Sequence, residues 1–136
     1  MLKESYTVIG VMSGTSLDGV DLAHIHFRVI DRKWQYEIHE SETVSYSDDW
    51  LNKLRTAVDF SKVELTQLNK DYTVLLGNII KEFIQKHKIT NLDAVCSHGH
   101  TILHQPQNGF TLQIGNLKKL PPLLAKPSFV FSGCKL

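Results

Sequence analysis

A polar, glycine-rich loop between two apolar runs is the sequence feature that most constrains how this chain can fold. Residues 6–12 are apolar and β-branched, which predicts a buried strand, and residues 21–30 alternate in polarity, which predicts a second strand. Between them, residues 13–19 contain two glycines, three hydroxyl side chains and one carboxylate. Two strands separated by so short a loop predict an antiparallel hairpin at the start of the fold.

This loop has the chemistry of a phosphate-binding site. Glycines let the backbone approach an anion closely, and successive N–H groups can donate to it together with the hydroxyls of Ser13, Thr15 and Ser16. Asp18 or Asp21 could hold Mg²⁺, which prefers carboxylates and phosphate oxygens. The alternative is a plain surface hairpin whose acids and glycines satisfy turn geometry. The loop matches neither a Walker A loop nor a dinucleotide-binding loop.

The remaining sequence predicts a third strand, two helices and further strands. Three strands joined by short turns indicate an antiparallel meander, and the long helix carries one continuous apolar stripe for the core. A strand that follows a helix is expected to join the sheet in parallel, with ligands bound beyond its carboxyl end. The expected elements are strand 34–46, helix 50–58 capped by residues 47–49, connection 61–64, helix 65–87, strand 92–97 ending at the block 98–101, and a hairpin of residues 101–104 and 110–114.

The composition of the chain excludes several classes of partner. Of its 136 residues, 42% are hydrophobic, and the net charge is +1, so nothing favours nucleic acid or an anionic membrane. No apolar run approaches the roughly 20 residues of a membrane span, and we expect no signal peptide. Two cysteines, Cys96 and Cys134, are too few for a disulfide scaffold. We therefore expect a cytoplasmic protein of one domain.

Two blocks of the sequence resemble the anhydro-N-acetylmuramic acid kinase family. Residues 10–21 match the family signature Gly-x-Met-Ser-Gly-Thr-Ser-x-Asp-Gly-x-Asp at every fixed position. Residues 97–101, 104–106 and 111–116 correspond to Ser-His-Gly-Gln-Thr, His-x-Pro and Thr-Leu-Gln-Ile-Gly-Asp or Asn in the family. His100 replaces the usual Gln of the second block. The resemblance covers about residues 6–116.

The resemblance implies a fold and an activity. The fold is α/β, the N-terminal lobe of the actin, Hsp70 and sugar-kinase (ribonuclease H-like) superfamily, with a three-stranded antiparallel meander, helices and a parallel strand. The family uses ATP to phosphorylate the amino sugar 1,6-anhydro-N-acetylmuramic acid while opening its anhydro ring. The product is N-acetylmuramic acid 6-phosphate, which belongs to cell-wall recycling. A full-length member is expected to form a homodimer.

The same resemblance assigns binding residues. It places the sugar beside His98, Gly99 and Thr101, near the Gln105-Pro106 turn, and Mg²⁺ at Asp18. It places the phosphates of ATP at Ser13, Gly14, Thr15, Ser16, Leu17, Asp18, Gly19, Val20 and Asp21. The surface-hairpin alternative for the two acids remains open.

Three histidines near the second block suggest a metal site as a further alternative. His98, His100 and His104 have plausible ligand spacing, but apart from the nearby Cys96 no Cys or carboxylate at comparable spacing completes a set. We favour the interpretation that they face the sugar or pack in the core. His24 and His26 alternate along a strand, which is typical of a polar strand face.

Residues 117–136 do not continue the family pattern, so we expect an atypical tail after an N-terminal ATPase-like lobe of residues 1–116. The family places its catalytic Asp in a segment with an Asp-Phe-Arg motif, followed by a Gly-Gly-Gln-Gly-Ala-Pro loop, and neither motif is present. We interpret the change as a truncation or frameshift, or as a disordered tail, and assign no catalytic residue. The chain alone is expected to have little kinase activity. The alternatives are a non-catalytic nucleotide-binding module and an inert remnant.

Overall fold

The computed structural model describes residues 4–14, 16–115 and 129–132, and these form a mixed α/β fold around one sheet. The sheet has the strand order β3-β2-β1-β4-β5, and β6 also pairs with β4. The elements are β1 (Ser5–Ser13), β2 (Val20–Ile30), β3 (Lys33–Val44), α1 (Asp48–Thr56), η1 (Ala57–Asp59), α2 (Lys62–Lys86), β4 (Ala94–Gln105), η2 (Pro106–Asn108), β5 (Phe110–Ile114) and β6 (Phe129–Ser132).

The predicted meander is confirmed. β1 pairs antiparallel with β2, and β2 pairs antiparallel with β3. β4 follows the long helix and lies parallel to β1, as a strand after a helical crossover should. The predicted fold class, an α/β lobe with a three-stranded meander, helices and a parallel strand, is therefore confirmed.

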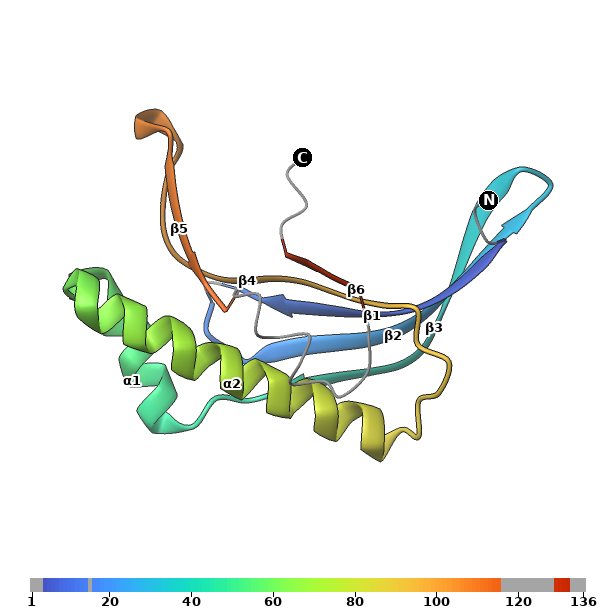
Figure 1. Ribbon diagram of the computed structural model, residues 1–136, viewed down its shortest axis with the longest axis horizontal. Helices are drawn as coiled ribbons and strands as arrows, with labels where there is room; N and C mark the ends of the chain where they lie inside the picture. Colours follow the sequence, from blue (N-terminus) through green and yellow to red (C-terminus); the bar gives the residue numbers. More distant parts are fainter. Residues whose placement is uncertain (1–3, 15, 116–128, 133–136) are drawn as a thin grey trace.

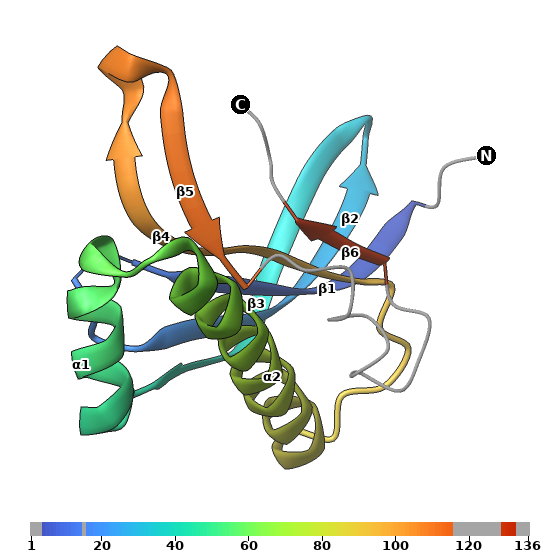
Figure 2. The same cartoon turned by 60° about the vertical axis from the view of Figure 1, so that its left-hand side comes forward.

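Both α-helices lie on the same side of the sheet, while the far ends of the β2–β3 and β4–β5 hairpins bend away from them (Figure 1; Figure 2). The core forms between α2 and the central strands. Strand β1 contributes Ile9 and Val11 to it, and α2 contributes Tyr72, Leu76 and Ile80. Alternate residues of β1 point to the same face of the sheet, so the face that buries Ile9 also buries Ser13 at the end of the strand.

The start of α2 differs from the prediction. We expected residues 61–64 to be a connection, but Ser61 is the N-cap and Lys62 already belongs to the helix. The side chain of Ser61 accepts a hydrogen bond from the backbone N–H of Glu64, and the Glu64 carboxylate accepts one from the backbone N–H of Ser61. This capping box satisfies two N–H groups that the first turn leaves free, so the helix begins three residues earlier than its apolar stripe.

The prediction that a strand ends at residue 97 was wrong. β4 continues to Gln105, so the block 98–101 lies inside the strand and not beyond its carboxyl end. The strand continues because it changes partners: residues 94–97 pair with β1 and β6, and residues 100–105 pair with β5. The hairpin of β4 and β5 around η2 was predicted correctly. Most of the expected tail, residues 117–136, lies outside the described residues, which include only Phe129–Ser132 of it.

Candidate functional site

The loop between β1 and β2 presents its polar tip to solvent. Gly14, Ser16 and Asp18 are exposed, and the backbone N–H of Leu17 donates to the carbonyl oxygen of Gly14 at 3.2 Å. Leu17 is half-buried against the core with a φ of 61°, and Gly19 is buried with a φ of 149°. Two anchored residues therefore hold a tip whose hydroxyl, carboxylate and backbone groups remain available to a ligand.

Ser13 has a different environment from the tip. Its side chain is buried, and its Oγ lies 2.8 Å from Nδ1 of His100 and 2.5 Å from the hydroxyl of Tyr46. The hydroxyl of Tyr46 lies 2.6 Å from that of Tyr72. We call these four residues the Ser13 network. Burial raises the pKa of Tyr46 and of Tyr72, so both phenols are neutral at physiological pH.

The two sequence blocks meet in space. Ser13 pairs with His100 in the parallel register of β1 and β4, after an irregularity that lets β4 carry one extra residue. Gly99 lies in this irregularity with a φ of 74°, which favours glycine. The Oγ1 of Thr101 accepts a hydrogen bond from Nε2 of Gln113 on β5 at 3.2 Å. The structure therefore places Ser13, at the start of the expected phosphate loop, beside His100 and next to the irregularity that contains Gly99.

Each of the remaining predicted residues is buried, is already hydrogen-bonded to a neighbour, or lies outside the part of the chain that the structure describes. Val20 is fully buried in the core. Asp21 is exposed on β2, and its carboxylate accepts a hydrogen bond from the Thr43 hydroxyl at 2.5 Å. Thr15 lies outside the described residues, as does the side chain of His98. The placement of ATP, Mg²⁺ and sugar at these residues stays a prediction.

Two histidines of the second block, His100 and His104, contact hydroxyl groups. Nδ1 of His100 contacts Ser13, and Nδ1 of His104 lies 2.8 Å from Oγ1 of Thr111. Among the residues that the structure describes, no group of three or more His, Cys, Asp or Glu side chains is placed to hold a metal ion. The metal alternative for this block therefore gains no support.

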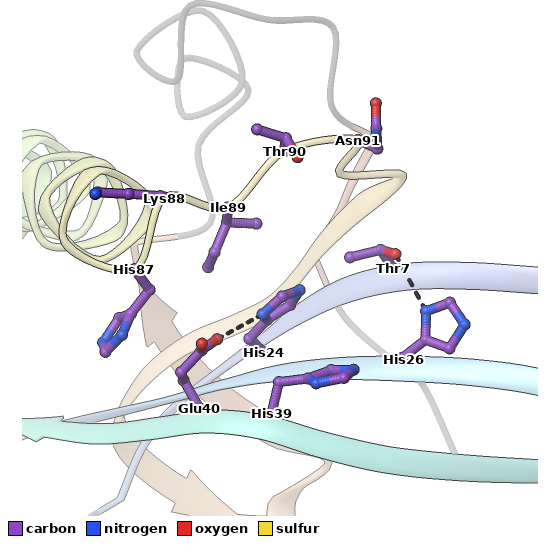
Figure 3. A pocket seen from close by; sticks show the side chains of 10 residues that line it. All are labelled: Thr7, His24, His26, His39, Glu40, His87, Lys88, Ile89, Thr90 and Asn91. Atoms are coloured by element: carbon purple, nitrogen blue, oxygen red, sulfur yellow. Dashed lines mark hydrogen bonds and ion pairs between the residues drawn. The ribbon is translucent and has the colours of Figure 1, made fainter.

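A histidine-lined pocket of about 270 Å³ lies toward the other end of β1 (Figure 3). Nδ1 of His24 lies 2.7 Å from the Glu40 carboxylate, and this hydrogen bond lowers the pKa of Glu40. The β2–β3 register shifts beside His24, which lets both His39 and Glu40 line the pocket. The pocket is lined by Thr7, His24, His26, His39, Glu40, His87, Lys88, Ile89, Thr90 and Asn91.

Sequence reasoning missed two features of these sites. Tyr46 and Tyr72 were expected to be ordinary strand and core residues, yet their hydroxyls belong to the Ser13 network. The pocket was missed because it depends on the register shift that turns His39 and Glu40 to one side. The alternation of His24 and His26 was a signal for the pocket, but nothing in the sequence of the expected strand 34–46 indicates the register shift.

The fold and the loop together define a class of protein. An α/β sheet with a meander, a parallel crossover strand and a polar loop after β1 is consistent with the N-terminal lobe of a sugar kinase. In the described part of the chain, no helix is both long and apolar enough to cross a bilayer.

Comparison with known proteins identifies the family. The sequence model of the family described as "Anhydro-N-acetylmuramic acid kinase" matches residues 6–125, which extends past residue 116. The chain belongs to this family. It is 37% identical over 131 residues to the anhydro-N-acetylmuramic acid kinase of Pseudoalteromonas atlantica, covering 87% of this chain and 33% of that protein. The corresponding protein of Bacillus cereus (strain G9842) is 36% identical over 118 residues, which cover 79% of this chain and 31% of the relative. The chain thus spans about a third of the length of these relatives.

Proposed function

We propose that the β1–β2 loop binds the phosphates of ATP in a kinase that phosphorylates 1,6-anhydro-N-acetylmuramic acid while opening its anhydro ring. Asp18 holds the accompanying Mg²⁺, and the amino sugar lies beside His98, Gly99 and Thr101 on β4. The product would be N-acetylmuramic acid 6-phosphate. The use of ATP places the reaction in the cytoplasm.

One observation carries this proposal: the exposed tip of the loop holds Ser16 and Asp18, and it belongs to the region that the family model matches. Oxygen ligands and phosphate suit Mg²⁺, which rarely uses a cage made of protein alone. The hydroxyl of Ser16 and the backbone N–H groups of a glycine-containing loop suit the phosphate oxygens. The pairing of Ser13 with His100 brings the second block next to the start of the loop, which supports a sugar site near the transferred phosphate.

Calorimetric titration of the 136-residue chain with ATP, with and without Mg²⁺, tests the binding step. We expect Mg²⁺-dependent binding, and we expect Asp18→Asn to weaken it about tenfold because the metal loses its only charged ligand from the loop. Asp31→Asn is the matched control, since Asp31 lies in the exposed β2–β3 turn, and it should bind like the wild type. Equal affinities in the Asp18→Asn variant and the wild type would contradict the assignment.

An ADP-release assay with the anhydro sugar tests turnover. We propose that this chain binds nucleotide without turnover, because no residue in it corresponds to the catalytic Asp that the resemblance implies. Turnover near that of a relative such as the Bacillus cereus protein would refute this part of the proposal. Absence of both binding and turnover would favour an inert polypeptide.

A further inference from the structure

The Ser13 network contains three hydroxyl groups and one imidazole nitrogen, joined in a row by three contacts. The row runs from Tyr72 through Tyr46 and Ser13 to Nδ1 of His100, with distances of 2.6, 2.5 and 2.8 Å. All four residues are buried, and the side chains come from α2, the β3–α1 connection, β1 and β4. The network therefore ties the start of the loop to three other parts of the fold.

The number of hydroxyl protons in the row indicates which group donates and which accepts in each hydrogen bond. Each neutral hydroxyl has one proton to donate, so three hydroxyls can supply three hydrogen bonds if His100 accepts at Nδ1. Tyr72 then donates to Tyr46, Tyr46 donates to Ser13, and Ser13 donates to His100. In the opposite direction the proton of Tyr72, which is fully buried, could not be donated to Tyr46, and the acceptor left for it among the described residues would be the Ser13 hydroxyl, a poorer partner than Tyr46. A buried proton with only a poor acceptor is unfavourable, so the first direction is preferred.

We infer that Tyr46, Tyr72 and His100 are positioning residues that fix Ser13 and, through it, the loop that follows; this inference rests on the proposed function of the loop as a phosphate site. His100 is the neutral tautomer with its proton on Nε2. The hydroxyl proton of Ser13 is committed to His100, so Ser13 anchors the loop and does not donate this proton to phosphate. Among the residues of the tip that the structure describes, the hydroxyl of Ser16 and the backbone N–H groups other than that of Leu17 are the donors left for the ligand.

The same chemistry explains how His100 can stand where the family pattern that residues 97–101 resemble has Gln. The side-chain carbonyl oxygen of a Gln is also a neutral acceptor, so it can take the Ser13 proton and preserve the direction of the row. A Leu at this position offers no acceptor and would leave the Ser13 proton buried without a partner. The pair His100→Gln and His100→Leu therefore separates the hydrogen-bonding role of this residue from its packing role.

The tautomer is measured first, by long-range ¹H–¹⁵N NMR correlation of the histidine rings in the 136-residue chain. We expect His100 to show an unprotonated Nδ1 and a protonated Nε2. A protonated Nδ1 would overturn the inference, since the row would then run in the other direction. This measurement needs no nucleotide, so it decides the direction of the network even if the chain does not bind ATP.

Amide hydrogen exchange and Mg-ATP titration of variants then test positioning. Tyr46→Phe and His100→Leu should raise the exchange of the amides of residues 14–19 relative to those of β1, and should weaken Mg-ATP binding about tenfold. In His100→Gln, the exchange rates of the loop amides and the affinity for Mg-ATP should stay within about twofold of the wild type. The same is expected of the control Tyr36→Phe, which changes an exposed Tyr outside the network.

Two outcomes separate failure of the inference from failure of the proposed function. If the wild type binds no Mg-ATP but the loop amides respond as expected, the loop is positioned by the network and the phosphate assignment is wrong. If the wild type binds Mg-ATP and His100→Leu binds equally well with unchanged loop exchange, the network does not position the loop and the inference is wrong.

Discussion

At the scale of single residues, glycines with positive φ shape the region where the two blocks meet. Gly99 has a φ of 74°, and a Cβ built there would overlap the carbonyl oxygen of Ile114 on β5. Gly19 is similar, since its Cβ would overlap the carbonyl oxygen of Val44. These residues allow close approach of two backbones as well as an unusual conformation. The backbone beside Ser13 and His100 therefore depends on positions without side chains.

Replacing Gly99 by Ala should destabilise the fold strongly. The variant combines the strain of positive φ with a backbone clash, so we expect its free energy of unfolding to fall by about 2 kcal/mol or more. Gly109→Ala is the matched control, because Gly109 has a φ of 66° and open space around its Cβ position. It should lose only about 1 kcal/mol, from backbone strain alone. If urea unfolding shows the same decrease in the free energy of unfolding for both variants, the structure relieves the predicted clash at Gly99.

At the scale of elements, polar and charged contacts with Glu42 hold the carboxyl end of α2 against β3. The Glu42 carboxylate lies 3.1 Å from Nζ of Lys86 and 3.2 Å from Nε2 of His87. Positive groups at this end also suit the helix dipole. The hydrogen bond from Lys86, and then that from His87, lowers the pKa of Glu42 below its usual value of 4.5. The contact therefore favours the ionised carboxylate of Glu42 over the protonated form.

The stability of the fold should depend on pH because the pKa of Glu42 is lower in the folded chain than in the unfolded one. Because the folded pKa lies below the unfolded one, ionised Glu42 stabilises the fold above pH 4.5, and the contribution is lost as the pH falls through the folded pKa. We expect Glu42→Gln to be less stable than the wild type at pH 7, and the difference to shrink in acid. Urea unfolding at several pH values measures it. If Glu42→Gln stays less stable than the wild type by the same amount at low pH, or if Glu37→Gln shows the same loss, the ionised Glu42 carboxylate is not the cause.

The sequence predicted the type and location of the helices and strands more accurately than the residues at which they begin and end. Hydrophobic periodicity located the meander, both helices and the crossover strand, because each depends on a regular apolar face. It placed the start of α2 too late, since Ser61 and Glu64 stabilise the first turn through hydrogen bonds and not through burial. It ended β4 too early because residues 98–101 are polar, yet the strand continues through them, and His100 and Thr101 pair with neighbouring strands.

Part of the candidate site was predictable and part was not. The exposed loop tip followed from local sequence, since its glycines, hydroxyls and Asp18 are close in the chain. The Ser13 network did not, because Tyr46, Tyr72 and His100 join it from three distant segments. Nothing in a tyrosine within an apolar stripe indicates where its hydroxyl will point. Long-range polar contacts of this kind depend on the register of the assembled sheet.

At the scale of the whole molecule, the sheet has two unequal faces. The α-helices lie on one face (Figure 1; Figure 2). On the other face, Trp34, Tyr36 and Ile38 of β3 are 58%, 71% and 54% exposed, and they alternate along an edge strand. An edge strand with large apolar side chains is a template for association with another chain.

The chain should therefore self-associate as its concentration rises. Sedimentation velocity over a range of concentrations should show a growing average mass, and Trp34→Lys should reduce it because a charge on an edge strand opposes pairing. Val74→Lys is the control, since Val74 is 49% exposed on α2, which lies on the helical side of the sheet. A concentration-independent monomer, or an equal response to both substitutions, would contradict the role of the β3 face.

The parallel pairing of β1 with β4 has a consequence for the order in which the chain folds. The meander can form from neighbouring segments, but β4 joins β1 through contacts such as the one between Thr7 and Asp93, which are 86 residues apart. Closing so large a loop is slow, because its entropy is lost before the contacts form. We therefore expect one edge of β1 to stay unpaired until the chain has folded back through α2. Because His100 lies on β4, we expect the loop after Ser13 to acquire its final shape only after β4 has paired with β1.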